Sequence, residues 1–338
     1  MSTPDRNAAL RDRRVARVID REIAPIWHDR FARLIIRNLP QKEGLFVLDI
    51  ECGPGRLTTE VLQRTDRTTR VLALETSPAL LELAKSRVRP EWKRRVYHKP
   101  GTFDDIMSMG DASYDLTLAN LVLNETHDVG SAITELSRIT RPGGRVMATM
   151  PMYGSWEEVE DIFAEVLLDA GLKDAARRLK RFRSVRPSPA QLSEVVRGQG
   201  IDRKDFVIEH ERLQLLFPSG REFLFAPLIE HGPLRLWKAI IGKEGSAAEL
   251  FWKLKEAIDT YYQGHVFAVT LVAGLINIGL PDPETDQPAL TAEFWQHYPQ
   301  LDALWGRMAN PRGIQSPFSG SDDDDFDFDL DIDFEDPG

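Results

Sequence analysis

The sequence predicts an α/β fold: a doubly wound, mostly parallel sheet of seven strands with helical insertions. Short apolar runs alternate with helix-like segments between residues 45 and 150, as they do in parallel sheets that helices cover on both faces. A glycine-containing turn directly follows the first of these runs. Two more strand-like segments, at residues 205–217 and 265–278, are expected to extend the sheet.

The first half contains five predicted strands, which are apolar runs bounded by turn residues: 45–50, 71–74, 95–98, 115–120 and 145–150. Helices are predicted over 57–63, after Ser77-Pro78 and over 128–140. Ser followed by Pro is typical of a helix start, because Ser caps free N–H groups and Pro suits the first turn. Upstream, apolar residues at helical spacing predict one helix over 21–39, and a turn is expected at residues 141–144.

The second half is richer in helix signals. Ser155 and Glu158 match a capping box before a helix that Gly171 ends, and Ser188 starts another helix. Further helices are predicted over 219–241 and 247–261. The expected organisation is N-terminal helices over 1–44, a main domain over 45–280 with helical insertions near 152–200 and 219–262, a Pro-rich segment over 281–320 and a disordered acidic tail over 321–338.

The net charge of −10 arises in that tail. Residues 321–338 hold ten of the 53 acidic residues and no base, which leaves 43 acids against 43 Lys and Arg elsewhere. A neutral body disfavours a nucleic-acid partner. From 325 to 334 acids alternate with apolar residues, a pattern too charged to pack alone. A protein partner for the tail is one hypothesis, and a solubilising role is the other.

Composition also bounds the chemistry and the compartment. Cys52 is the single cysteine, which excludes an intramolecular disulfide and a Cys-rich zinc site, and no metal is expected. The longest apolar stretch, at 266–280, is shorter than the ~20 residues of a membrane-spanning helix. Residues 1–21 lack the apolar region of a secretory signal. A cytoplasmic protein without a membrane span is therefore expected.

The turn after the first strand is the main candidate for a ligand site. Gly53 and Gly55 let the backbone approach a ligand, and the following helix adds a positive dipole. Asp49 ends the first strand and Glu75 the second, where an acid reaches ribose hydroxyls in a doubly wound sheet. Thr58 stands where a dinucleotide fingerprint needs its third glycine, so a nicotinamide dehydrogenase is disfavoured.

These segments resemble those of the class I S-adenosylmethionine-dependent methyltransferases, in the type 11 subgroup with ubiquinone/menaquinone and biotin-pathway methyltransferases. The resemblance is strongest over 45–150 and is carried by VLDIECGPG at 47–55, LALETSP at 72–78, SYDLTLANLVL at 113–123 and RITRPGGR at 138–145. It implies a Rossmann-like fold. It also implies methyl transfer from S-adenosyl-L-methionine to a small-molecule or carrier-bound acyl acceptor, by O- or C-methylation.

The resemblance further implies a cofactor site. Asp49, Gly53 and Gly55 would line the methionine and ribose part, and Glu75 would bind the ribose hydroxyls. The segment 102–103 would lie against adenine, and 120–121 at the methyl-transfer end. The full expected set is Asp49, Glu51, Gly53, Gly55, Glu75, Thr76, Thr102, Phe103, Asn120 and Leu121.

Two of these residues depart from the family pattern. Glu51 stands where the first motif usually has glycine, which would strain the backbone if the position needs a positive φ. Its carboxylate would repel the cofactor's carboxylate or pair with the cofactor's amino group. Thr102 replaces an acid that commonly meets the adenine amine. A degenerate methyltransferase-like binding or regulatory module is therefore the alternative function.

The sequence identifies no dedicated catalytic base. Asn124, His127 and Tyr153 are weak candidates on the substrate side; the alternative is a turn role for Asn124 and an exposed loop position for His127. His28 reaches the site only if its helix folds over it. The apolar and aromatic residues of the insertions, such as Phe223, indicate either a hydrophobic acceptor or internal packing.

Overall fold

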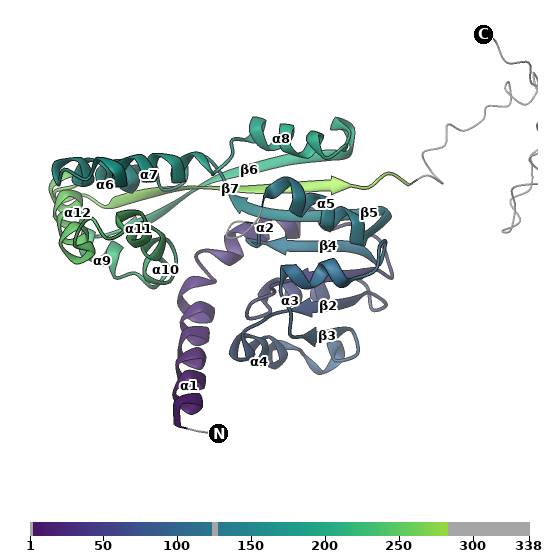
Figure 1. The fold of residues 1–338 in the computed structure, drawn as a ribbon. Coiled ribbons are helices and arrows are strands. Elements are labelled where there is room, and N and C mark those ends of the chain that lie inside the picture. The colour runs from purple at the N-terminus through teal and green to yellow at the C-terminus, as the bar shows by residue number, and fades with distance from the viewer. Residues whose placement is uncertain (1–2, 124–127, 283–338) are drawn as a thin grey trace, which may run out of the picture. The chain divides into compact units, whose positions relative to one another are not determined.

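The computed structural model of the 338-residue chain describes residues 3–123 and 128–282. Their centre is a seven-stranded sheet with the strand order β3-β2-β1-β4-β5-β7-β6 (Figure 1). The first five strands pair in parallel, and β7 runs antiparallel to both of its neighbours. The predicted α/β class with a mostly parallel sheet is confirmed.

The first half alternates strands and helices as predicted. Its strands are β1 (Phe46–Ile50), β2 (Arg70–Leu74), β3 (Val96–Lys99), β4 (Tyr114–Asn120) and β5 (Thr140–Pro151). Between them lie α3 (Arg56–Arg64), α4 (Pro78–Arg87), the 3-10 turns η2 (Pro90–Trp92) and η3 (Phe103–Ser108), and α5 (Val129–Ile139). Ser77 caps α4 as expected, because its hydroxyl accepts a hydrogen bond from the Leu80 amide.

The start of β5 differs from the expectation of a turn at residues 141–144. Thr140 already pairs with Tyr114 of β4, so the strand includes the Pro-Gly-Gly segment. The register shifts between Tyr114 and Leu116, and Gly143 adopts a φ of 70°. Residues 141–144 therefore bend within an irregular part of β5 and do not form a separate turn.

The N-terminal segment also differs from its prediction of one helix over 21–39. It forms α1 (Thr3–Val18), one π-helical turn η1 (Ile19–Ile23) and α2 (His28–Arg37). Pro25 lies in the break, where its missing N–H removes a helical hydrogen bond. The carboxylate of Asp12 on α1 accepts bonds from the Ser77 hydroxyl (3.0 Å) and the Ala79 amide (3.3 Å), which holds α1 at the start of α4.

The second half contains α6 (Glu157–Asp169), α7 (Lys173–Ser184), α8 (Pro189–Gly198), η4 (Arg203–Asp205), β6 (Phe206–Phe217), α9 (Gly220–Leu224), α10 (Pro227–His231), α11 (Pro233–Ile241), α12 (Ala247–Tyr261) and β7 (Phe267–Gly279). Residues 267–272 of β7 pair with β6 alone, since β5 ends at Pro151 opposite Ala273. The β6–β7 ribbon thus extends beyond the carboxyl ends of the parallel strands.

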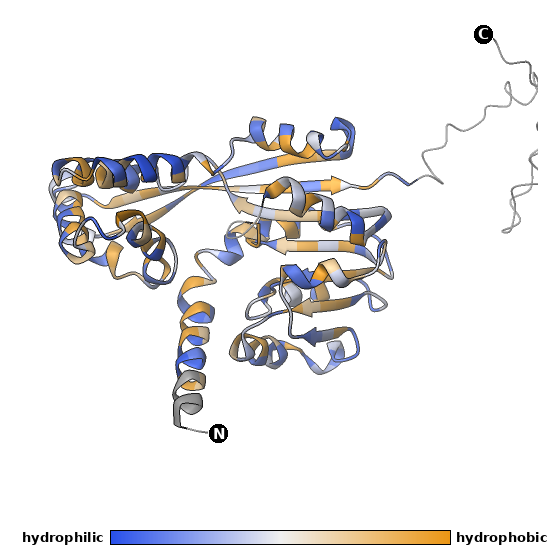
Figure 2. Ribbon diagram, in the orientation of Figure 1, coloured by the Kyte–Doolittle hydropathy of each residue, from blue (hydrophilic) through white to orange (hydrophobic). Residues whose placement is uncertain are grey.

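Helices of the second half form a hydrophobic cluster on this extension, centred on buried Phe163, Phe223 and Trp237 (Figure 1). Figure 2 shows hydrophobic residues along most strands, whereas the helices carry hydrophobic and hydrophilic residues side by side. No helix in the described ranges is both long and apolar enough to cross a membrane.

The predicted capping box at the start of α6 is wrong. Trp156 precedes the helix in a left-handed conformation, and neither predicted partner caps it. The Ser155 hydroxyl instead accepts a bond from the Val272 amide (2.9 Å), and the Glu158 carboxylate accepts one from the Thr270 amide (2.9 Å). Both side chains bind β7 because the folded chain places unpaired strand amides next to them.

Gly55 allows the contact between the first turn and α4. Its φ is 77°, and a Cβ at this position would lie 2.8 Å from Ala84 Cβ and 2.9 Å from Ala84 Cα. We predict that Gly55→Ala lowers the free energy of unfolding by about 2–4 kcal/mol, the sum of a left-handed alanine and local overpacking. Urea denaturation measures the change.

Gly171→Ala is the matched control. Gly171 has a φ of 76° but nothing within 4 Å of its Cβ position. It should lose only ~1–2 kcal/mol, the conformational cost alone. Equal losses in the two variants would contradict the packing argument.

Candidate functional site

The candidate site lies where the carboxyl ends of β1, β2 and β4 meet. The strand order reverses between β1 and β4, and ligands of open α/β sheets bind in the crevice at such a switch point. Three connections border this crevice: the turn 51–55 after β1, the segment 75–77 after β2, and residues 120–121 at the end of β4. We call it the switch-point crevice.

Glu75 joins two of these connections. One of its carboxylate oxygens accepts a bond from the Gly53 amide (3.0 Å), and the other accepts one from the Ser77 amide (2.8 Å). The Thr76 hydroxyl lies 3.4 Å from the second oxygen. Burial raises the pKa of Glu75, while these backbone donors act in the opposite direction. The oxygen bonded to Gly53 keeps a lone pair for a ligand hydroxyl, and a second ligand hydroxyl can replace the long Thr76 bond at the other oxygen.

Asp49 is the second carboxylate of the crevice and is 1% exposed. One oxygen accepts a bond from the Thr58 hydroxyl, and Oδ1 is buried without a hydrogen-bond partner among the described residues. The pKa of Asp49 is raised to about 7, mainly by burial; the bond from Thr58 acts in the opposite direction, and the charge of Glu75 acts in the same direction as burial. A buried acceptor without a donor costs free energy, so this oxygen favours a ligand that brings a hydroxyl or an ammonium group. Thr58, whose hydroxyl donates to Asp49, stands at the position where a dinucleotide-binding motif needs its third glycine.

Glu51 adopts the positive φ that the sequence analysis anticipated, at 52°. Its side chain crosses to the start of η3, where it accepts a bond from the Phe103 amide (3.1 Å). Thr102 beside it caps η3, since its hydroxyl accepts from the Asp104 amide (3.2 Å) and its own amide donates to Asp105 (2.7 Å). The expected adenine-side residues are thus already engaged with groups of the protein.

Asn120 and Leu121 lie at the end of β4, where Thr149 of β5 holds them. The Thr149 hydroxyl donates to the Asn120 side-chain oxygen (2.7 Å) and accepts from the Leu121 amide (3.0 Å). Leu121 has a φ of 66°, which this bond supports. Sequence reasoning missed Thr149, because nothing local indicates which side chain faces Asn120.

The first turn of α2 contacts the end of β4 and the start of α3. The Asn120 amide group donates to the His28 carbonyl (3.3 Å), and Asp29 pairs with Arg56, the first residue of α3. His28 is largely buried, and burial lowers its pKa to about 4. Its Nδ1 has no hydrogen-bond partner in the described part of the chain.

The other weak candidates contribute less. Asn124 and His127 lie outside the described residues. Tyr153 follows β5, is 59% exposed and bonds to Pro187 through its backbone amide. Cys52 is buried in the first turn, and burial raises its pKa. The buried aromatic residues of the insertions, Phe223 and Trp237, pack in the helical cluster, so internal packing explains them.

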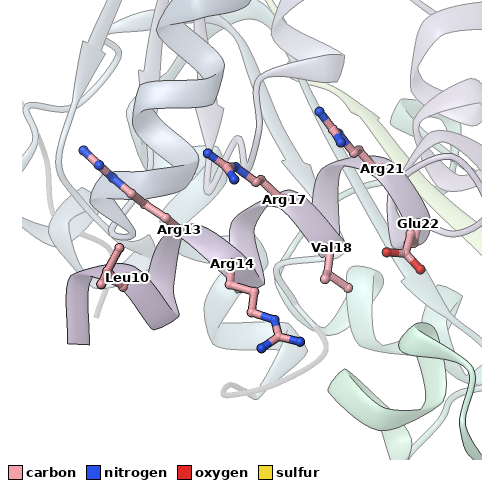
Figure 3. A pocket seen from close by; sticks show the side chains of 7 residues that line it. All are labelled: Leu10, Arg13, Arg14, Arg17, Val18, Arg21 and Glu22. Atoms are coloured by element: carbon pink, nitrogen blue, oxygen red, sulfur yellow. The ribbon is translucent and has the colours of Figure 1, made fainter. Parts of the chain in front are cut away.

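A separate hollow of about 410 Å³ lies on the outer face of α1. Figure 3 shows Arg13, Arg17 and Arg21 side by side along this helix. The lining consists of Leu10, Arg13, Arg14, Arg17, Val18, Arg21 and Glu22. Because no strand-end residue lines it, this hollow is distinct from the switch-point crevice.

Comparison with known proteins gives matches over the same region. Residues 48–148 match a family described as "Methyltransferase domain". A demethylmenaquinone methyltransferase of Lactococcus lactis is 25% identical over 183 residues, which are 52% of this chain and 71% of that protein. A malonyl-[acyl-carrier protein] O-methyltransferase of Pseudescherichia vulneris is 30% identical over 135 residues, 40% of this chain and 50% of that protein.

A magnesium-protoporphyrin O-methyltransferase of Rhodobacter capsulatus is 29% identical over 130 residues, 38% of this chain and 55% of that protein. The chain thus spans about half the length of this relative and of the P. vulneris relative. The matched region contains the turn after β1, the end of β2 and the end of β4.

The raised pKa of Asp49 makes stability depend on pH. Between the unfolded pKa near 4 and the folded pKa of about 7, the unfolded chain releases a proton that the folded chain keeps, so stability falls as pH rises. We compare the free energy of unfolding of Asp49→Asn with that of the wild type. We predict that the variant's value relative to the wild type is higher at pH 8 than at pH 4, by about 2–4 kcal/mol. Denaturation at both pH values measures this.

Asp128→Asn is the control of opposite sign. Its carboxylate caps α5, and bonds from Ser131 lower its pKa. Its stabilising contribution should therefore be lost as pH falls. A pH-independent effect of Asp49→Asn would show that Asp49 is ionised at no cost in the fold.

Proposed function

We propose that this chain, whose residues 48–148 are a class I methyltransferase domain of type 11, transfers a methyl group from S-adenosyl-L-methionine to a small-molecule or carrier-bound acyl acceptor. The observation that carries the proposal is the pair of buried strand-end carboxylates around the first turn. Glu75 is held by the Gly53 and Ser77 amides, and one oxygen of Asp49 has no donor among the residues that the structure describes. The matching family and relatives support the reaction class.

The residues of the crevice fit this cofactor. Glu75 is positioned to accept bonds from a pair of neighbouring hydroxyls, which a ribose presents. The free Asp49 oxygen suits the ammonium group of an amino acid. The absence of a side chain at Gly53 leaves open space within 4 Å of its Cβ position. When bound, the cofactor supplies an electrophilic methyl group on a positively charged sulfur.

The chain's own contribution is alignment and exclusion of water. A direct displacement needs the acceptor held in line with the methyl group, which a rigid crevice can provide. The helical cluster lies on the β6–β7 extension, at the same end of the sheet as the crevice, where the parallel strands have their carboxyl ends. We infer that these helices select the acceptor. The relatives named above support an acceptor defined at this class level.

A methyltransferase-like module without catalysis is the second candidate function. It is favoured by Glu51, whose carboxylate occupies the Phe103 amide while its backbone stays in a costly conformation. Binding without turnover over a broad panel of carboxylate, phenol and acyl-thioester acceptors would support this alternative.

Cofactor binding is the first test of the proposal. We predict micromolar affinity for S-adenosylmethionine and S-adenosylhomocysteine by isothermal titration, and a loss of about 10- to 100-fold in Glu75→Ala, which removes charged hydrogen bonds. Glu82→Ala is the control, because Glu82 is exposed on α4 and pairs with Arg13. Absence of binding, or equal affinities in the two variants, would contradict the assigned site.

Glu51→Gly separates the two candidate functions. Glycine relieves the positive φ, at about 1 kcal/mol, and releases the Phe103 amide. We predict that affinity for S-adenosylhomocysteine rises about 3- to 10-fold, the value of one hydrogen bond. Glu51→Gln, which keeps an acceptor oxygen at this length, should change the affinity less. An unchanged affinity in Glu51→Gly would remove Glu51 as the reason for weak binding.

A further inference from the structure

His28 and Asp49 carry two buried polar atoms that lack partners among the described residues, His28 Nδ1 and Asp49 Oδ1. Both belong to segments that border the switch-point crevice. Asp49 lies on β1, and the backbone of His28 is bonded to Asn120 at the end of β4. Such orphaned atoms are rare in folded proteins and indicate a ligand that completes the site.

The first turn of α2 is fixed on both sides of the crevice. On the β4 side, Asn120 bonds to the His28 carbonyl, and Thr149 holds the Asn120 side chain in turn. On the β1 side, Asp29 accepts a bond from Arg56 Nε (2.8 Å) at the start of α3. The first turn of α2, which begins at His28, is therefore held at the end of β4 and at the start of α3.

The His28 ring is uncharged near neutral pH. Its pKa is lowered to about 4, mainly by burial; Asp29 acts in the opposite direction, and the Arg56 guanidinium acts in the same direction as burial. A neutral imidazole carries one N–H donor and one nitrogen lone pair. An uncharged ring avoids electrostatic repulsion of a positively charged ligand and can accept a hydrogen bond or a proton.

We propose that His28 faces the reacting end of the bound cofactor, contacts the methyl acceptor and takes the proton of an acceptor that carries one. This rests on the proposed function. None of the residues singled out as weak catalytic candidates occupies a comparable position within the described part of the chain.

The step balances without a further reactant. An oxygen lone pair of the acceptor forms the new bond to the methyl carbon as the carbon–sulfur bond breaks, and its electron pair stays on sulfur. The acceptor's O–H electrons return to oxygen while the proton passes to the His28 nitrogen. The positive charge thus moves from sulfur to imidazole, which later releases the proton to water. A weak base is sufficient, because an alkylated hydroxyl is itself strongly acidic.

The test compares two cofactor analogues, which makes it independent of the acceptor. Sinefungin carries a protonated amine at the position of the transferred methyl group, and S-adenosylhomocysteine lacks any group there. We expect His28→Phe to lower the preference for sinefungin over S-adenosylhomocysteine at least tenfold, while the dissociation constant of S-adenosylhomocysteine changes less than twofold. Titration calorimetry on the full chain measures both.

Three further variants sharpen the test. His28→Asn places an acceptor oxygen near the position of Nδ1 and should restore most of the preference, whereas His28→Gln mimics the other ring nitrogen and should not. His98→Asn is the matched control, because His98 Nε2 is also buried without a partner among the described residues but lies on β3, at the edge of the sheet. It should leave the preference unchanged.

Each result of this test either supports or overturns the proposal for His28. An unchanged preference in His28→Phe would overturn the proposal. Equal weakening of both analogues would also overturn it, because His28 would then serve only the fold or the common part of the cofactor. A wild-type chain that binds neither analogue would contradict the proposed function itself, a result distinct from a failure confined to His28.

Discussion

The bond from the Gly53 amide to the Glu75 carboxylate is the constraint around which the crevice is built. It ties the turn after β1 to the end of β2, and the Cys52 amide adds a second tie to the Leu74 carbonyl (2.8 Å). The turn can approach β2 so closely because Gly53 and Gly55 adopt positive φ values and Gly55 contacts Ala84 without a side chain. A side chain at Gly55 would push this turn away from α4.

The same arrangement leaves negative charge in the core. Asp49 and Glu75 are both buried, and each raises the cost of ionising the other. The guanidinium of Arg56, which directly follows the turn, pairs with Asp29 of α2. The buried carboxylates therefore lower the stability of the fold, and a cationic ligand with several hydroxyl groups would supply the hydrogen bonds that they lack. Binding sites often reduce stability in this way. Burial likewise keeps the His28 ring neutral.

The sequence predicts those features that local patterns determine. Apolar runs located the seven strands, Ser77 and Ser188 marked real helix caps, and Asp49 and Glu75 came together at the strand ends. Predictions failed where a distant segment competed for the same groups. Ser155 and Glu158 match a cap but bind β7. The places of Thr149 and His28 follow from how α2 and β5 pack on β4, which no short motif encodes.

The most direct test of the account is the difference electron density of crystals grown with S-adenosylhomocysteine. The account predicts density across the first turn in the switch-point crevice, with two ribose oxygens within hydrogen-bond distance of Glu75 and the amino group at Asp49. Density in another place, such as the hollow on α1, or an empty crevice at saturating ligand would contradict it.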